Sequence, residues 1–376
     1  MRLSGERFAV KYRLQGESRE EAHARARDIC LEQTVEFPEE LVPAGFIRDE
    51  IVGRVEWLEE TGRKTYLAEI SFAVETAADE LTQLLNVIYG NISIKPGIRV
   101  ESLRLPPALS EKLRGPRFGR DGLRSLLNVP RRPLLHTALK PMGLTAGELA
   151  DVAYRCALGG IDIVKDDHGL TNQCSAPFAE RVGRCAEAVG KANRLTGASS
   201  IYVANITAAP AEMVNRAQIA KAAGAGGFLV SPALAGLGAM GQIAGDDSLG
   251  LPVISHPAFQ GSYCINPASG ISHYAYYGQI TRLAGADAVV YPNFGGRFSF
   301  SREECAGIAA GTMADMGGIK AIFPSPGGGM SLEKVPEMLA VYGREVIFLI
   351  GGGLFRHGPD LLQNCRHFRA MVEQYE

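Results

Sequence analysis

The sequence contains the segment Gly159-Gly160-Ile161-Asp162-Ile163-Val164-Lys165-Asp166-Asp167-His168, in which a short apolar run is followed by four ionisable residues. The β-branched residues in the apolar part are typical of a strand that is covered on both faces. A cluster of charges at its end is too costly to be unpaired core packing. Two interpretations are open at this point: a hard-cation site on a rigid strand end, or a salt-bridged strand terminus.

The same kind of strand recurs along the later part of the chain. Short apolar strands are predicted at 134–139, 161–167, 200–206, 227–232, 252–259, 287–294, 320–326 and 346–353. Amphipathic helical stretches separate them, for example 148–158, 178–195, 211–223, 274–283, 303–313 and 332–342. Eight strand–helix repeats predict a (β/α)8 barrel. A doubly wound open sheet is the alternative, but no GxGxxG opens the first crossover.

The first part of the chain has a different pattern. Strands are predicted at 8–14, 53–58, 64–70 and 98–105, with helices beginning at Ser18 and Leu81. This order predicts a small α+β (ferredoxin-like) domain. A basic, turn-rich link at 113–122 follows it. We therefore expect an N-terminal α+β domain at 1–122 and a C-terminal α/β TIM barrel at 123–376.

Composition excludes several classes of function. The 376 residues carry a formal net charge of -2, so the chain has no electrostatic footprint for nucleic acid or an anionic membrane. Residues 1–7 contain no apolar core of signal-peptide length, and no apolar run approaches a membrane span. The seven cysteines include no CxxC pair, which indicates a reducing compartment and no disulfide framework. We expect a cytoplasmic protein with no membrane partner, no nucleic-acid partner and no nucleotide cofactor.

Candidate functional residues follow the predicted strands, as expected for a barrel whose chemistry lies at the carboxyl ends. They are Thr137, Lys140, Lys165, Asp167, His168, Asn205, His256, Asn293, Arg297 and Ser325, together with glycine triplets at 327–329 and 351–353. Glycine loops after strands seven and eight commonly cradle a phosphate, because the backbone can approach it closely. The alternative is a pair of tight turns without a ligand. A small phosphorylated molecule is the favoured ligand.

Lys165 has two possible roles. It neutralises the neighbouring carboxylates Asp166 and Asp167, or its amine reacts with carbon dioxide to give a carbamate. A carbamate would join Asp167 in an oxygen-rich site for Mg²⁺. The residue types alone do not decide between these roles.

The segment ending Lys165-Asp166-Asp167-His168 resembles the metal-site signature of the RuBisCO large-chain superfamily, in which Lys-Asp-Asp is followed by glutamate. The resemblance extends over nearly the whole chain and includes Gly90-Asn91, Lys140-Pro141, His256-Pro257, Gly296-Arg297 and both glycine loops. It implies one Mg²⁺ per site, held through a carbamylated Lys165, and an enediolate intermediate. It also implies a homodimer with sites shared between subunits.

The resemblance further implies roles for individual residues. The metal ligands would be Lys165, Asp167 and His168, and the catalytic residues Lys140, Lys165, His256 and Arg297. Residues from both subunits would bind substrate or phosphate, with the first three reaching across from the neighbour: Glu32, Thr34, Asn91, Thr137, Ser325, Gly328, Gly329, Gly351 and Gly352.

Departures from the carboxylase pattern indicate a RuBisCO-like protein of the form IV branch that does not fix carbon dioxide. His168 replaces the third carboxylate ligand, which changes the preferred metal. Pro257 and Val290 stand where carboxylases have an arginine and a histidine for a second phosphate, so a substrate with one phosphate is expected. Arg297 replaces the mobile-loop lysine, and the two side chains are not equivalent.

The remaining chemistry is removal of a proton beside a carbonyl, with the enolate oxygen stabilised by metal and nearby donors. Lys140 is the expected base and His256 the residue that orients a hydroxyl or relays a proton; a surface lysine and a core histidine are the alternatives. We expect His136 to be structural. From the sequence we favour a Mg-dependent decarboxylase of a 3-oxo sugar-acid phosphate. The alternatives are an enolase or isomerase of a methylthioribulose-type 1-phosphate, and a non-catalytic sugar-phosphate-binding protein.

Overall fold

The computed structural model describes residues 3–298 and 300–375. The chain folds into two compact units. The first contains Met1–Arg114, Gln260–Leu283 and Ala314–Ile319, and the second contains Gly115–Phe259, Ala284–Met313 and Lys320–Glu376. Two segments of the later half therefore belong with the N-terminal sheet, an arrangement that the strand and helix patterns did not indicate.

The first unit is built on a five-stranded sheet with the order β10-β4-β1-β3-β2. Its elements are β1 (Arg7–Gln15), α1 (Arg19–Glu32), η1 (Glu39–Leu41), η2 (Ile47–Ile51), β2 (Arg54–Gly62), β3 (Thr65–Ala73), η3 (Val74–Ala77), α2 (Leu81–Tyr89), η4 (Asn91–Ile94), β4 (Ile98–Arg104), α3 (Pro107–Ser110), α10 (Gly261–Cys264), β10 (Gly270–Ile271), η5 (Tyr274–Ile280) and α11 (Thr281–Leu283). Strands β1 to β4 pair antiparallel, and β10 adds parallel to β4. The predicted α+β layer is confirmed.

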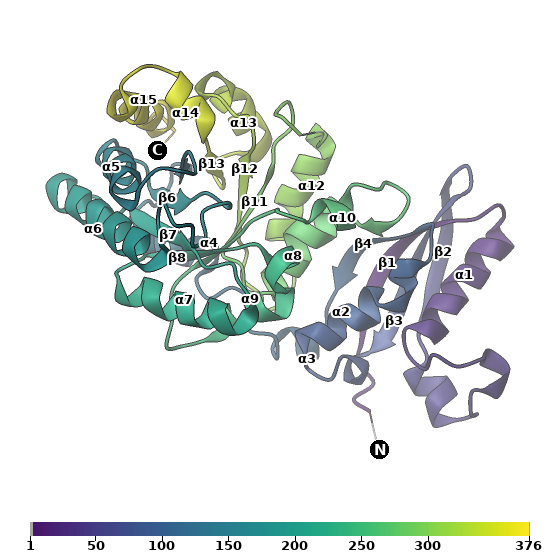
Figure 1. The fold of residues 1–376 in the computed structure, drawn as a ribbon. Coiled ribbons are helices and arrows are strands. Elements are labelled where there is room, and N and C mark those ends of the chain that lie inside the picture. Colours follow the sequence, from purple (N-terminus) through teal and green to yellow (C-terminus); the bar gives the residue numbers. More distant parts are fainter. Residues whose placement is uncertain (1–2, 299, 376) are drawn as a thin grey trace. The chain divides into compact units, whose positions relative to one another are not determined.

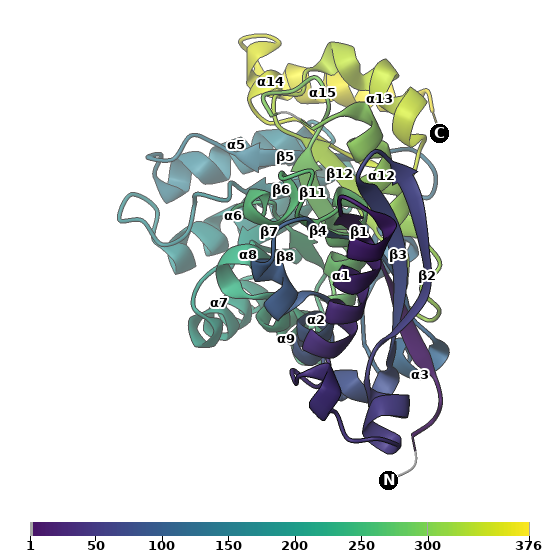
Figure 2. The same ribbon diagram turned by 90° about the vertical axis from the view of Figure 1, so that its right-hand side faces the viewer.

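One face of this sheet is covered by α1 and α2 (Figure 2). Alternate residues of β1, from Phe8 to Leu14, are buried, whereas Lys11 between them is exposed. The Tyr12 hydroxyl donates to the Ile88 carbonyl of α2 at 2.7 Å. The Gln33 amide at the end of α1 donates to the Val87 carbonyl at 2.9 Å, so the two helices lie beside each other.

The segment 274–283, expected to be a barrel helix, is instead part of the first unit. It forms the π-helix η5 and the short α11. The Gln279 side chain accepts from the Leu103 backbone N–H and donates to the Leu103 carbonyl, both at 2.8 Å. Its amphipathic pattern predicted a helix correctly but does not specify which sheet the helix covers.

The second unit contains eight parallel strands in the order β12-β11-β9-β8-β7-β6-β5-β13 (Figure 1). They are β5 (Leu134–Leu139), β6 (Ile163–Asp166), β7 (Ile201–Asn205), β8 (Gly227–Val230), β9 (Val253–Ser255), β11 (Ala288–Pro292), β12 (Phe323–Gly327) and β13 (Ile347–Leu349). The strands at the two ends of this order, β12 and β13, pack against each other. Gly327 of β12 lies so close to β13 that an added Cβ atom would be 2.9 Å from Leu349 Cδ2. The predicted barrel and all eight of its strands are confirmed.

Helices surround the barrel strands (Figure 1). They are α4 (Gly119–Leu127), α5 (Ala146–Leu158), α6 (Phe178–Thr196), α7 (Pro210–Ala222), α8 (Pro232–Ala235), α9 (Leu237–Gly245), α12 (Arg302–Met313), η6 (Leu332–Lys334), α13 (Val335–Tyr342), α14 (Gly352–Arg356) and α15 (Leu361–Glu373). The start of α5 is fixed by a capping box between Thr145 and Glu148. Within the described ranges, no helix combines the length and apolar character needed to cross a membrane.

The barrel core is formed by every second residue of each strand. One buried cluster contains Leu134, Ile163, Val203, Leu229, Ile254, Val290, Phe323 and Ile347, together with residues of α4 that close one end. Strand alternation then assigns the next inward positions to Lys165 on β6 and His136 on β5. This alternation determines which charged residues face the barrel interior.

Candidate active site

The charged run on β6 is divided between the two faces of the strand. Lys165 faces the interior, level with Ala138 on one side and Val203 on the other. Its side chain is 1% exposed, and its amine donates to the Asp166 carbonyl at 3.1 Å. Asp166 faces outward toward α6, whereas Asp167 follows the strand end on the side of Lys165.

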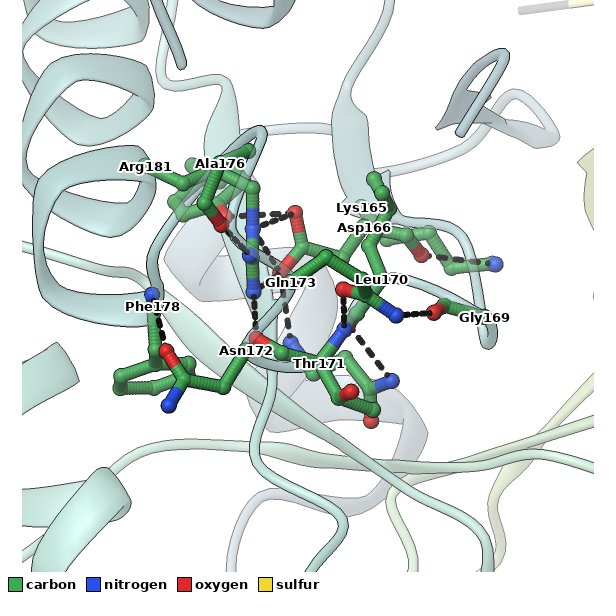
Figure 3. Close-up of polar contacts among 12 residues, drawn as sticks. Lys165, Asp166, Gly169, Leu170, Thr171, Asn172, Gln173, Ala176, Phe178 and Arg181 are labelled. Carbon is green, nitrogen blue, oxygen red and sulfur yellow. Dashed lines mark hydrogen bonds and ion pairs between the residues drawn. The ribbon is translucent and has the colours of Figure 1, made fainter. Parts of the chain in front are cut away.

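Asp166 is fully engaged in structural contacts (Figure 3). Its carboxylate pairs with Arg181 Nε of α6 at 3.2 Å and accepts from the Tyr202 hydroxyl at 2.7 Å. Arg181 also donates to the carbonyls of Thr171 and Ala176, both at 2.8 Å. This buried network fixes the loop that follows β6 against α6. Asp166 is therefore an anchor for the site and is not open to a ligand.

Asp167 is the partly open carboxylate. One of its oxygens lies 2.5 Å from Lys140 Nζ and the other 3.3 Å from His168 Nδ1. Burial by itself would raise the pKa of Asp167, but the hydrogen bonds from His168 and Lys140 and the charge of Lys165 hold that pKa below its usual range. Asp167 is thus an anionic oxygen donor, and its side chain is 21% exposed.

His168 and His256 form a stacked pair that the sequence did not predict. Their ring centroids are 4.5 Å apart and the planes differ by 11°. The Ala258 backbone N–H donates to His256 Nδ1 at 3.2 Å, which leaves the ring hydrogen on Nε2. Burial, reinforced by the charge of Lys165, holds the pKa of His256 well below its ordinary value. His256 is accordingly a neutral imidazole with an Nε2–H donor.

Lys165 is held in an environment that favours its neutral amine. Burial, assisted by the charge of Lys140, lowers the pKa of Lys165 to about 8, although Asp167 opposes this change. The neutral amine is the form that reacts with carbon dioxide. Across the described ranges, no three His, Cys, Asp or Glu side chains are arranged to hold a metal ion. A metal site here would therefore depend on an oxygen ligand formed on Lys165.

The glycines after β12 are required by a close contact between two loops. Gly328 and Gly329 have φ of +81° and +91°. The Arg297 backbone N–H, from the loop after β11, donates to the Gly328 carbonyl at 3.0 Å, and a Cβ atom at Gly329 would lie 2.8 Å from that nitrogen. Loop packing therefore explains part of this glycine triplet. The exposed Arg297 side chain lies over the Phe298 ring.

Two of the three glycines after β13 are more open, whereas a Cβ atom added to Gly353 would clash with the Met330 carbonyl of the loop after β12. A Cβ atom at Gly351 would lie 3.5 Å from Lys140 Cε, and one at Gly352 would meet nothing within 4 Å. Lys140 therefore lies between Asp167 and the loop after β13. This loop has the space for a ligand that the loop after β12 lacks.

Two of the predicted phosphate ligands are buried in the barrel wall. The Thr137 hydroxyl donates to the Ile350 carbonyl at 2.8 Å. The Ser325 hydroxyl lies 3.3 Å from His136 Nδ1. Neither side chain is exposed, so both hydroxyls are occupied within the barrel. Their contact with a phosphate stays a prediction.

The residues expected to reach a neighbouring subunit lie in the first unit. Asn91 Nδ2 donates to Glu32 Oε1 at 3.0 Å, and Lys95 Nζ lies 3.9 Å from the other Glu32 oxygen. The Thr34 hydroxyl donates to the Cys30 carbonyl at 2.6 Å. Glu32 and Asn91 thus form one polar pair, and their contact with a neighbouring subunit's site stays a prediction.

The family profile described as "Ribulose bisphosphate carboxylase large chain, catalytic domain" matches residues 120–360. The chain belongs to the RuBisCO large-chain family. A Rhodopseudomonas palustris protein named "Ribulose bisphosphate carboxylase-like protein 1" is 38% identical over 98% of both chains. The solved structure of a Rubisco-like protein from that organism has a TM-score of 0.88, with 36% identity and 98% of each chain covered. This RuBisCO family member is of the RuBisCO-like, form IV type.

Other relatives carry names of enzymes. "5-methylthioribulose-1-phosphate isomerase" of Rhodospirillum rubrum is 37% identical, covering 93% of this chain and 92% of its own. "2,3-diketo-5-methylthiopentyl-1-phosphate enolase" of Geobacillus kaustophilus is 30% identical, covering 82% of this chain and 75% of its own. The protein is an enzyme of the RuBisCO-like group.

Proposed function

We propose that this RuBisCO-like enzyme isomerises 5-methylthioribulose 1-phosphate or a close analogue by proton transfer beside the carbonyl. The observation that carries the proposal is the 37% identity with the Rhodospirillum rubrum isomerase over 93% of the chain. The decarboxylase that we favoured from the sequence gains no support, because none of the relatives named above is a decarboxylase. The isomerase or enolase alternative is the better supported prediction.

A divalent ion fits the inward face of the β6 end. Lys165 has a buried amine whose pKa is about 8, and the Asp167 carboxylate beside it is ionised and partly open. Lys165 as a carbamate, Asp167 and His168 would hold Mg²⁺ there, although His168 Nδ1 already faces Asp167. When bound, the ion supplies stabilisation of negative charge on a substrate oxygen.

Lys140 is the proposed proton acceptor. In this structure its amine is paired with Asp167, and its Cε atom adjoins Gly351. If Asp167 turns toward a cation, Lys140 loses its partner and is left with an amine at the open loop after β13. Lys140 can then take a proton from a carbon beside the carbonyl.

His256 is the proposed donor to the substrate oxygen. Its Nδ1 is occupied by the Ala258 N–H, and stacking on His168 fixes the ring plane. The Nε2–H is therefore a preorganised donor for a carbonyl or hydroxyl oxygen on which charge develops. Removing one such donor costs about 100-fold in turnover in comparable sites.

We place the substrate phosphate at the loop after β13, with Gly351 and Gly352 as its main contacts and Gly328, Gly329 and Arg297 at its side. The open space at Gly352 supports this position.

We further propose a homodimer in which Glu32, Thr34 and Asn91 of one subunit complete the site of the other. The Glu32–Asn91 hydrogen bond presents these two side chains as one polar group.

The test is incubation with 5-methylthioribulose 1-phosphate, Mg²⁺ and bicarbonate in D₂O, followed by ¹H and ³¹P NMR. We expect a new phosphate signal from the isomer and deuterium at the carbon beside the carbonyl. Lys140→Met should lose at least about 100-fold of this exchange. Saturable binding without exchange would instead identify a sugar-phosphate-binding protein. In a separate incubation with a 3-oxo sugar-acid phosphate, release of carbon dioxide would support the decarboxylase and contradict the isomerase.

The second candidate is the enolase reaction, favoured by the 30% identity with the Geobacillus kaustophilus enzyme. It requires the same kind of proton removal beside a carbonyl, but from a 2,3-diketone in place of a hydroxyketone. Parallel assays with 2,3-diketo-5-methylthiopentyl 1-phosphate separate the two: faster turnover of the diketone would select the enolase.

A further inference from the structure

The barrel interior contains a polar pair in an otherwise apolar layer. His136 of β5 faces inward, and its ladder neighbours on the adjacent strands are Ile163 and Leu349. Its ring lies 3.3 Å, Nδ1 to Oγ, from Ser325 of β12, and both side chains are fully buried. His136 Nε2 has no hydrogen-bond partner among the residues described.

An unpaired buried nitrogen is costly. Leaving a buried polar group unsatisfied costs about 1–3 kcal/mol. An apolar side chain of similar size would match Ile163 and Leu349 and would avoid this cost. A purely structural explanation of His136 therefore accounts for its bond to Ser325 but not for its free nitrogen.

Lys165 lies one inward step above His136. Ala138, the next inward residue of β5, is level with Lys165 in the sheet. The buried Lys165 amine has several N–H donors but, among residues 3–298 and 300–375, a single hydrogen bond, to the Asp166 carbonyl. An under-satisfied donor and an unpartnered ring nitrogen thus face the same interior from neighbouring strands.

The bond to Ser325 is compatible with either neutral tautomer of His136, because a hydroxyl can donate or accept. If Nδ1–H donates to the Ser325 hydroxyl, Nε2 carries a lone pair and is an acceptor. Burial, with the charge of Lys165 nearby, keeps the pKa of His136 well below its ordinary value, which agrees with a neutral ring. One buried water between Lys165 Nζ and His136 Nε2 would have a donor on one side and an acceptor on the other, as buried waters require.

We propose that His136 is a positioning residue that holds the Lys165 amine through a buried water, with Ser325 orienting its ring. This inference rests on the proposed function only in treating Lys165 as part of the active site. Without the acceptor below it, the Lys165 amine would turn toward the Asp167 carboxylate, which lies two residues further on the same side. That new ion pair would occupy both groups that the site needs free.

The first experiment compares stability with turnover in His136→Leu and His136→Gln. The leucine variant removes the unpaired nitrogen but also the bond to Ser325, and because these two effects oppose each other the melting temperature should stay within about 4 °C of the native value. Its isomerisation rate should fall at least about tenfold. Glutamine, which keeps an acceptor, should recover much of that rate. A rate loss that merely follows a fall in melting temperature would overturn the proposal.

Ser255→Ala is the matched control. Like His136, Ser255 is fully buried and has an unpartnered polar atom among the described residues. It differs in facing away from the barrel interior, because its neighbour Ile254 on β9 is a core residue and strand side chains alternate. Its removal should change the turnover by less than about twofold. If Ser255→Ala loses as much turnover as His136→Leu, the effect comes from any buried polar deletion and the proposal fails.

The second experiment needs neither substrate nor metal. In ¹⁵N-histidine-labelled protein, the His136 ring nitrogens should report a neutral imidazole protonated on Nδ1. Lys165→Met should shift the Nε2 signal, whereas His357 and His367, which stack on each other at 4.6 Å in α14–α15, should not respond. An unchanged His136 signal overturns the proposal even if isomerisation is observed. A shifted signal in a protein that lacks isomerase activity supports the contact and refutes only the proposed function.

Discussion

Asp166 and Asp167 are adjacent in the sequence and have opposite environments. Asp166 lies on the outer face of β6, has no exposed surface and is paired with Arg181 and Tyr202. Asp167 lies on the inner side, is 21% exposed and contacts Lys140 and His168. The first carboxylate holds the β6 loop in place, and the second is available to a ligand.

Both residues carry the same charge, so it is the face of the strand that decides their roles: the outward side chain of Asp166 anchors the loop, and Asp167 on the inner side is open to a ligand. The salt-bridged strand end predicted from the opening segment describes Asp166, whereas the cation site at Lys165 and Asp167 stays a prediction. The following substitutions separate these two roles.

Asp166→Asn should cause the largest change in stability. It leaves Arg181 buried without a counter-charge, and breaking a buried pair costs about 3–5 kcal/mol. The melting temperature should fall by about 10 °C. The double variant Asp166→Leu/Arg181→Leu should recover most of this loss in a calorimetric comparison. A single variant as stable as the native chain would contradict the anchoring role.

Asp167→Asn should cause the largest change in activity. It removes an ionised oxygen donor, and the buried Lys165 beside it can adopt its neutral form because its pKa is about 8, so turnover should fall by at least about 100-fold while the melting temperature changes little. Steady-state kinetics and thermal unfolding of the same preparation measure both. If Asp167→Asn unfolds as Asp166→Asn does, the contrast between the two positions is lost.

His168→Asn should have a smaller effect. The imidazole is a proposed metal ligand beside Asp167 and also stacks on His256, so its removal should weaken Mn²⁺ binding by at least about tenfold. Electron paramagnetic resonance titration with Mn²⁺ and bicarbonate measures this. Unchanged affinity would show that His168 serves only to orient His256.

The state of the Lys165 amine should change gradually with pH. Its folded pKa of about 8 is below the ordinary lysine value, so the neutral amine forms in the folded protein as the pH rises through 8. Because the unfolded chain holds this proton more tightly than the folded protein, the free energy of unfolding should rise between about pH 8 and 10.5 and stay at its lower level below pH 8. With ¹³C-bicarbonate, the carbamate signal should rise severalfold between pH 7 and 9 and be missing in Lys165→Met. A signal that falls over this range would contradict the assignment.

Much of the fold followed from short-range pattern. The eight barrel strands were predicted because each is a brief apolar run, and the helix between 274 and 283 because it is amphipathic. The membership of that helix, and of β10, in the N-terminal unit was not predictable, since it depends on the Gln279–Leu103 hydrogen bonds and the pairing of Gly270 with Arg99.

The candidate site was predicted as a set of strand ends but not as contacts. Strand ends brought Lys140, Lys165, Asp167 and His256 together because parallel strands in a barrel share one rim. The stacking of His168 on His256 and the inward turn of Ser325 toward His136 depend on side-chain geometry across strands distant in sequence. The orientation of His136 was predictable, because strand side chains alternate and His136 lies two residues after the core residue Leu134 on β5.

A crystal structure of the protein grown with Mg²⁺ and bicarbonate tests the central claim most directly. We expect continuous density from Lys165 Nζ through a carbamate to an ion bound by Asp167, with Lys140 displaced from its 2.5 Å contact with that carboxylate. A bare Lys165 amine and an intact Lys140–Asp167 ion pair at saturating concentrations of both would contradict it.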